Sequence, residues 1–123
     1  MIKLFILLGS LNATLVVMLG AFGAHGLKAR LSQEMLAVFQ TGVQYHFYHA
    51  LGLFAVAFVA SQFPDSTLVK WSGWTMLAGI VLFSGSLYIL SLSGIRWLGA
   101  ITPLGGLAFI VAWCLLAIAV VKN

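Results

Sequence analysis

Charged side chains are scarce in this sequence. Only 7% of its 123 residues are charged, with two acidic and six basic side chains, whereas a soluble domain of ordinary composition carries about 25%. Hydrophobic residues make up 63% of the chain. A soluble fold of this length cannot bury so much apolar surface, so the composition excludes a soluble globular domain and points to a lipid environment.

Cysteine and proline are also nearly absent, with one and two residues respectively. The single Cys114 excludes an internal disulfide and is interpreted as a small apolar side chain. Pro64 and Pro103 stand where hydrophobic runs are interrupted, which is where proline is tolerated. The basic residues are scattered singly rather than clustered on one face. This distribution argues against a nucleic-acid partner and favours cations that flank a membrane.

What the sequence does have is four hydrophobic runs, each near the roughly 20 residues that a membrane-spanning helix requires. We therefore predict an all-α membrane protein, a bundle of four transmembrane helices that forms one integral membrane domain over residues 1–123. Lys28 and Arg30 closely follow the first run, which favours a retained helix over a cleaved signal peptide. The predicted spans are residues 4–24, 43–60, 68–92 and 102–121.

The segment between the first two runs, residues 27–41, has a different pattern. Its apolar residues recur at helical spacing with polar residues opposite, and Ser32 is a candidate N-cap with Glu34 close behind it. We predict a short amphipathic helix at the membrane interface after the first span, either separate or continuous with the second span. Gly42 is the expected bend. Other helix ends are predicted at Asp65 or Ser66 (N-cap), Ser93-Gly94 (stop) and Thr102 (N-cap, with Pro103 as the first helical residue).

An even number of spans places both termini on the same side of the membrane. The six basic residues then divide equally between the two sides, with Lys3, Lys70 and Lys122 on one and Lys28, Arg30 and Arg96 on the other. Because the count is tied, the positive-inside rule does not decide the orientation.

Unusual polar residues gather at one side, where the first and third spans end and the second and fourth begin. On the second span Tyr45, His46 and His49 lie along one stripe at spacings of three and four. A histidine this deep in a span is a functional-site candidate, and the simpler alternative is a neutral imidazole that bonds to a neighbouring helix. The predicted polar cluster consists of His25, Tyr45, His49, Ser84, Ser86, Tyr88 and Thr102.

Metal or haem binding is one alternative for this cluster. His25, His46 and His49 would together supply three imidazoles, enough for a zinc or copper site, and two histidines on different helices would suffice for a haem iron. No carboxylate lies inside a span to orient such ligands, so no cofactor is predicted. A small transporter or channel is a second alternative, with His49 as its titrating group.

The leading hypothesis is a non-enzymatic binding or assembly protein. Residues 83–88 lack the Gly-x-Ser-x-Gly order of a serine nucleophile, and the spans are rich in Gly, Ala and Ser, which allow helices to approach closely. The expected partners are the lipid bilayer and a second copy of the chain or another membrane protein.

Four segments resemble a known family in the same order. They are residues 20–25 (Gly-Ala-Phe-Gly-Ala-His), 39–49 (Phe-Gln-Thr-Gly-x-x-Tyr-x-x-x-His), 82–88 (Leu-Phe-Ser-Gly-Ser-Leu-Tyr) and 102–106 (Thr-Pro-x-Gly-Gly). The chain resembles the YgdD/YwdK-type family of small bacterial proteins, a domain of unknown function, over nearly its whole length. The resemblance implies a multi-pass protein of the bacterial plasma (inner) membrane without an established activity. His46 departs from the family pattern, where Gln is usual, so His25 and His49 are the favoured metal pair.

Overall fold

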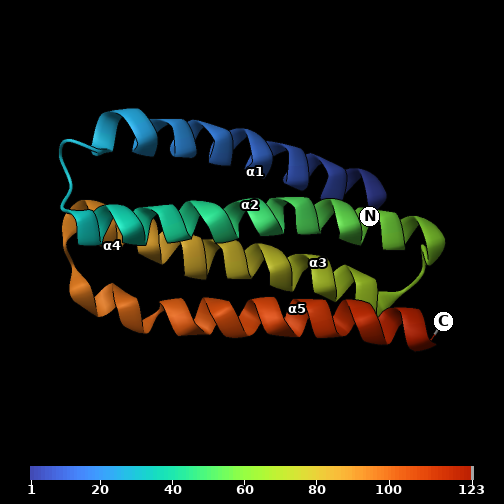
Figure 1. Ribbon diagram of the computed structural model, residues 1–123. Helices are drawn as coiled ribbons and strands as arrows, with labels where there is room; N and C mark the ends of the chain where they lie inside the picture. Colours follow the sequence, from blue (N-terminus) through green and yellow to red (C-terminus); the bar gives the residue numbers. More distant parts are fainter. Residues whose placement is uncertain (123) are drawn as a thin grey trace.

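The computed structural model describes residues 1–122, and every regular element in that range is helical. Four helices are long and apolar enough to cross a membrane: Ile2–Leu27, Gln33–Gln62, Thr67–Ser93 and Arg96–Lys122. Each predicted span falls within one of them. The four helices lie side by side with short connections, and the N- and C-termini are at the same end of the bundle (Figure 1). We call this the terminal end.

Three of the four helices contain a turn that is not α-helical. The first consists of α1 (Ile2–Phe22) and the π-helical η1 (Gly23–Leu27), and the second is α2 (Gln33–Gln62) alone. The third contains α3 (Thr67–Gly79), the π-helical η2 (Ile80–Gly85) and α4 (Ser86–Ser93). The fourth contains the 3-10 helix η3 (Arg96–Ala100) and α5 (Thr102–Lys122). We call the end of the bundle that carries η1, the start of α2 and η3 the η3 end.

Local chemistry at the helix ends largely follows the sequence pattern. The Ser32 hydroxyl accepts a hydrogen bond from the Met35 backbone N–H at 3.1 Å, and the Ser66 hydroxyl accepts one from the Val69 N–H at 3.4 Å. Both are N-caps, which satisfy backbone donors that a helix start leaves free. Gly94 ends α4 with φ 76°, a left-handed conformation in which glycine avoids the Cβ clash. These predicted ends are confirmed.

The predicted interfacial helix is the first part of α2, so the continuous form of that prediction holds. The α-helix runs through Gly42 without interruption, and the bend predicted there is wrong. Gly42 is instead a contact point, because a methyl group at this position would lie 3.0 Å from the Tyr88 ring. Its small size serves helix packing rather than a change of direction.

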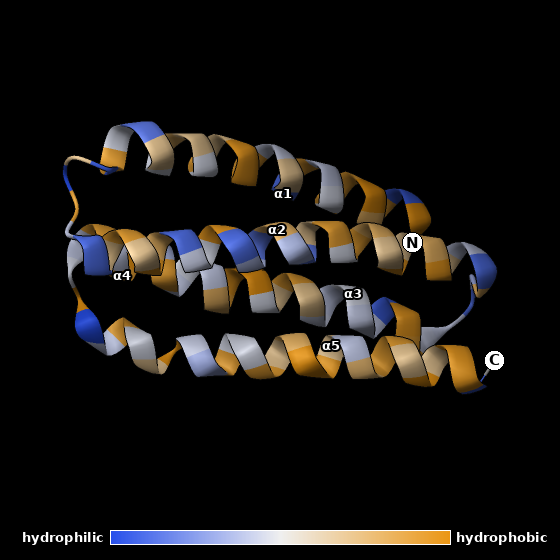
Figure 2. Cartoon of the chain, viewed as in Figure 1, coloured by the Kyte–Doolittle hydropathy of each residue, from blue (hydrophilic) through white to orange (hydrophobic). Residues whose placement is uncertain are grey.

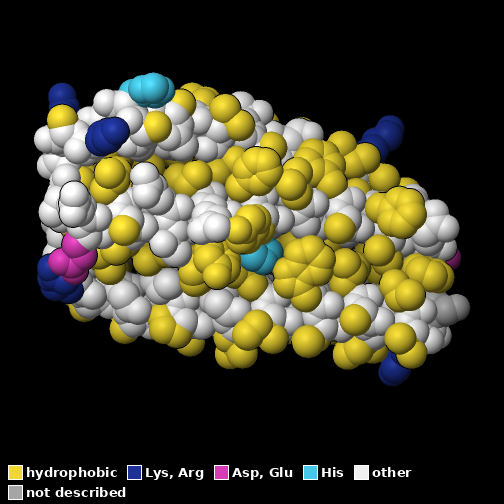
Figure 3. All heavy atoms as spheres, viewed as in Figure 1, with side chains coloured by type: hydrophobic (Ala, Val, Ile, Leu, Met, Phe, Trp, Pro, Cys, Tyr) yellow, Lys and Arg dark blue, Asp and Glu magenta, His cyan; other side chains and the backbone are white. Residues whose placement is uncertain are grey.

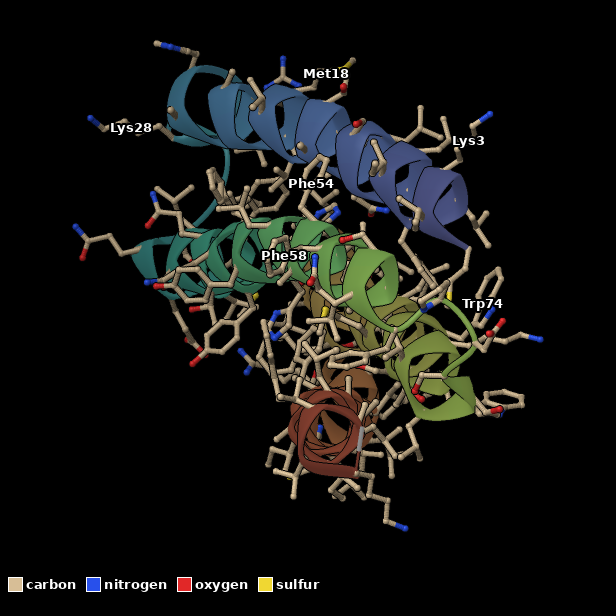
Figure 4. All side chains as sticks on the ribbon, turned by 90° about the vertical axis from the view of Figure 1, so that its right-hand side faces the viewer. Lys3, Met18, Lys28, Phe54, Phe58 and Trp74 are labelled. Atoms are coloured by element: carbon tan, nitrogen blue, oxygen red, sulfur yellow. The ribbon has the colours of Figure 1, made fainter. Side chains whose placement is uncertain are left out.

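The core is built from two close helix pairs, α1 on α2 and α3 on α5. Phe54 points from α2 toward α1 (Figure 4), where its ring lies over Gly9. Phe5 of α1 is fully buried and contacts Trp74 of α3 edge to face, with ring centroids 6.0 Å apart. Large apolar side chains and alanines fill the interior toward the terminal end, where the buried Ser72 of α3 donates a hydrogen bond to the Ala112 carbonyl of α5 at 2.7 Å.

The exterior is hydrophobic along the helices and charged at the two ends (Figures 2 and 3). Lys3 and Lys28 lie at opposite ends of the first helix and point away from the bundle (Figure 4). At the η3 end Arg96 pairs with Glu34 at 3.3 Å, and both side chains are largely exposed. Figure 2 also shows hydrophilic residues in the half of α2 nearer the η3 end, in the span itself.

Candidate functional site

His46 is the centre of a buried hydrogen-bond chain that joins three helices. Its Nδ1 lies 2.8 Å from the Tyr88 hydroxyl of α4 and its Nε2 lies 2.9 Å from the Asn12 Oδ1 of α1. The Asn12 amide nitrogen donates to the Leu8 carbonyl, so Oδ1 is the atom that faces the ring. Because the Asn12 Oδ1 only accepts hydrogen bonds, the His46 Nε2 must carry a proton. In the neutral ring Nδ1 then accepts a hydrogen bond from the Tyr88 hydroxyl. For the neutral imidazole that burial favours, the chain defines one tautomer, with the proton of His46 on Nε2.

His49 forms a second, separate connection from α2 to α5. Its Nδ1 donates to the Tyr45 carbonyl at 2.7 Å, and the Trp113 Nε1–H donates to its Nε2 at 3.1 Å. The Phe109 ring stacks on the imidazole with centroids 3.5 Å apart and an interplanar angle of 4°. Since indole is only a donor, His49 carries its proton on Nδ1 and is also neutral. The two histidines therefore hold opposite tautomers.

Hydroxyl groups complete the polar cluster near the η3 end. Ser84 of η2 donates to the Gly42 carbonyl of α2 at 2.8 Å. The Ser86 and Thr102 hydroxyls are 2.6 Å apart and join α4 to α5. Thr102 is the first residue of α5 rather than a residue before it, and the predicted use of its hydroxyl as an N-cap is replaced by this bond. All these groups bind helices to one another.

The residues of the predicted polar cluster therefore form several separate hydrogen-bonded groups rather than one site. Ser84, Ser86, Tyr88 and Thr102 each bond to another helix, and among these four Tyr88 alone bonds to a histidine. Asn12 and Trp113 were missed as partners. Asn12 offered a signal, because it is an amide inside the first apolar run. Trp113 offered none, because an aromatic residue in a span is most often part of the apolar surface.

The three-histidine metal site is wrong for the described part of the chain. Within residues 1–122 no three His, Cys, Asp or Glu side chains are placed to hold a metal ion. His25 is exposed on η1 and shares no hydrogen bond or ring contact with the other two in this range. His46 and His49 are separated by about 60° around α2, so they face different helices. Both nitrogens of each are already bonded.

Two grooves flank these hydrogen-bonded groups. The α2/α5 groove has a volume of about 480 Å³, and Figure 3 shows hydrophobic side chains around a histidine on this face. Its lining consists of Tyr45, His49, Phe83, Pro103, Gly106, Leu107, Phe109, Ile110 and Trp113. The smaller α1/η2 groove has about 250 Å³ and lies beside Asn12, His46 and Tyr88. The π-helical turn η2 contributes to both, through Phe83 to one and through Ile80, Val81 and Gly85 to the other.

The fold and its surface define a small multi-pass membrane protein of four helices. Residues 19–106 match the family model described as "Protein of unknown function (DUF423)", and the chain belongs to this family. It is 60% identical to the UPF0382 membrane protein YwdK of Bacillus subtilis, covering 98% of both chains. UPF0382 membrane proteins of Staphylococcus saprophyticus and Staphylococcus epidermidis are 51% and 48% identical over 98% of this chain and 98% and 97% of theirs. No solved structure matches the chain.

Proposed function

We propose that this is a non-enzymatic membrane protein that binds the hydrocarbon chain of a lipid in the α2/α5 groove. The observation that carries the proposal is the internal pairing of the polar groups of His49 and Trp113 in the groove. The Trp113 N–H and both His49 nitrogens bond within the protein. What the groove offers to a ligand is mostly aromatic and aliphatic surface. Such a surface favours an apolar chain.

The length of the groove supports the same ligand. Its lining on α5 extends from Pro103 to Trp113, which is roughly 15 Å at 1.5 Å per residue. This distance is about half of the roughly 30 Å hydrocarbon thickness of a bilayer. A groove that starts at the η3 end and stops near the middle of the membrane is suited to one acyl chain from one leaflet.

The groove opens sideways, between two helices that have few contacts with each other, α2 and α5. A lipid in the surrounding leaflet reaches it without crossing water. We also place the protein in the bacterial plasma (inner) membrane with both termini on one side. The membrane-protein names of its relatives and the position of both termini at one end of the bundle support this placement.

Native mass spectrometry of protein released from mild detergent tests the proposal. We expect the wild-type chain to carry an added lipid mass. A Gly106→Phe variant should lose most of it, because Gly106 lines the groove and a Cβ added there meets nothing closer than 3.9 Å, so the ring can extend into the groove. Ile118→Phe is the control, since Ile118 is a lipid-facing residue of the same helix outside the groove.

Equal lipid retention by wild type and Gly106→Phe would contradict the proposal. A mass equal to an integer multiple of the bare chain would also contradict it. That result would instead favour the use of this face for assembly with a second copy.

A further inference from the structure

Tyr45 carries the one hydroxyl group among the groove-lining residues. It makes no hydrogen bond to another residue within the described chain, where only the Tyr45 backbone carbonyl is used. The other two tyrosines differ, since the Tyr48 hydroxyl accepts from Gln44 at 2.6 Å and the Tyr88 hydroxyl bonds to His46. Tyr45 is 38% exposed. Its hydroxyl is therefore available to a ligand in the groove.

The direction of this side chain is set by its helix and its neighbours. Side chains of an α-helix lean toward the helix N-terminus, and α2 begins at the η3 end (Figure 1). The Tyr45 ring packs against Phe83 at a centroid distance of 4.7 Å and against Tyr48 at 5.5 Å. These contacts hold the ring at the wall of the groove, and the general lean of helical side chains directs its hydroxyl toward the η3 end.

We propose that the Tyr45 hydroxyl donates a hydrogen bond to the ester carbonyl of a membrane phospholipid whose acyl chain lies in the α2/α5 groove. This inference rests on the proposed function and names its ligand class. An ester carbonyl is the first polar group above an acyl chain, and it only accepts hydrogen bonds. Tyrosine places a donor at this depth, because its ring is apolar and its hydroxyl seeks the polar boundary.

Competition between two synthetic lipids tests the inference. A diester and a diether phosphatidylglycerol of equal chain length are offered together to the delipidated protein, and bound masses are measured by native mass spectrometry. Only the diester has the carbonyl. We expect wild type to prefer the diester by roughly threefold to tenfold, the effect of one net hydrogen bond. Tyr45→Phe should bind both lipids equally, with an unchanged melting temperature because its hydroxyl has no partner in the protein.

Tyr48→Phe is the matched control, since it removes a hydroxyl from the same helix at a residue outside the groove. It should keep the preference for the diester. Equal binding of diester and diether by wild type would overturn the inference and leave the lipid-binding function standing. A free fatty acid of equal chain length is offered as a third competitor, and its binding in preference to the diester would also overturn the inference. If neither lipid binds and Gly106→Phe changes nothing, the proposed function fails as well.

Discussion

At the residue scale, the molecule uses two neighbouring histidines as fixed, neutral connectors. His46 and His49 are 2% and 6% exposed, and each has both ring nitrogens bonded within the protein. A buried polar group is costly only when it lacks a partner. No buried side-chain nitrogen or oxygen among the described residues lacks one. The histidines thus add specificity to helix pairing inside an otherwise apolar bundle.

We expect His46→Leu to lower the melting temperature of the protein in detergent. Leu removes both bonds and leaves the Tyr88 hydroxyl and the Asn12 carbonyl oxygen without a partner, at a cost of about 1–3 kcal/mol. His46→Gln is the control, because its amide oxygen can accept from Tyr88 and its nitrogen can donate to Asn12. Thermal unfolding checks both variants. Equal melting temperatures for the His46→Leu and His46→Gln variants would contradict the assigned hydrogen bonds from His46 to Tyr88 and Asn12.

The sequence pattern favours His25 and His49 as a metal pair and gives His46 a weaker part. In the structure His46 connects more helices than either of the others. The spacing of three between His46 and His49 suggested a shared stripe. The structure separates them, because each imidazole is directed to the donor or acceptor that its own neighbouring helix presents, and that helix comes from a distant part of the sequence.

At the element scale, the backbones of η2 and α5 approach each other closely at Gly105. A methyl group at Gly105 would lie 2.7 Å from the Phe83 Cα, a backbone atom that cannot rotate away. The next residue, Gly106, has its nearest neighbour at 3.9 Å on the Phe83 ring. Glycine allows helices to approach closely, and the pattern Thr-Pro-x-Gly-Gly does not distinguish Gly105 from Gly106 in this role. The structure assigns the contact to Gly105 and leaves Gly106 in the groove.

Gly105→Ala should therefore be destabilising, because α5 would have to move away from η2. Overpacking of this kind costs about 1–3 kcal/mol. Gly106→Ala should be nearly neutral, since it adds the same methyl group one residue along the same helix into open space. The difference in melting temperature between the two variants is the measurement. A larger loss for Gly106→Ala would show that the rotation of α5 is misassigned.

At the scale of the whole molecule, an even number of helices returns the chain to its starting end. The equal division of basic residues between the two sides leaves the direction of insertion open. An even number of spans puts both termini on one side whichever direction the protein takes. The exposed Arg96–Glu34 pair adds little to stability, as surface ion pairs contribute a median of about 0–1 kcal/mol. The overall topology rests on hydrophobic run length.

Thiol labelling of intact cells tests the topology. In a Cys114→Ser background, Lys3→Cys and Lys122→Cys should react with a membrane-impermeant reagent from the same side. Lys28→Cys should react from the opposite side, because it follows the first span, and it serves as the internal control. Labelling of Lys3→Cys and Lys122→Cys from different sides would contradict four membrane crossings.

The all-helical membrane class, the number of long apolar helices and several helix ends could all be predicted from the amino-acid sequence. Those properties depend on composition, run length and local capping, which are written in contiguous residues. The neighbour that each polar side chain meets and the positions of the grooves became visible in the folded bundle alone. Those properties depend on how the helices rotate and cross, which is set by contacts such as Gly105 on Phe83 between segments far apart in the chain.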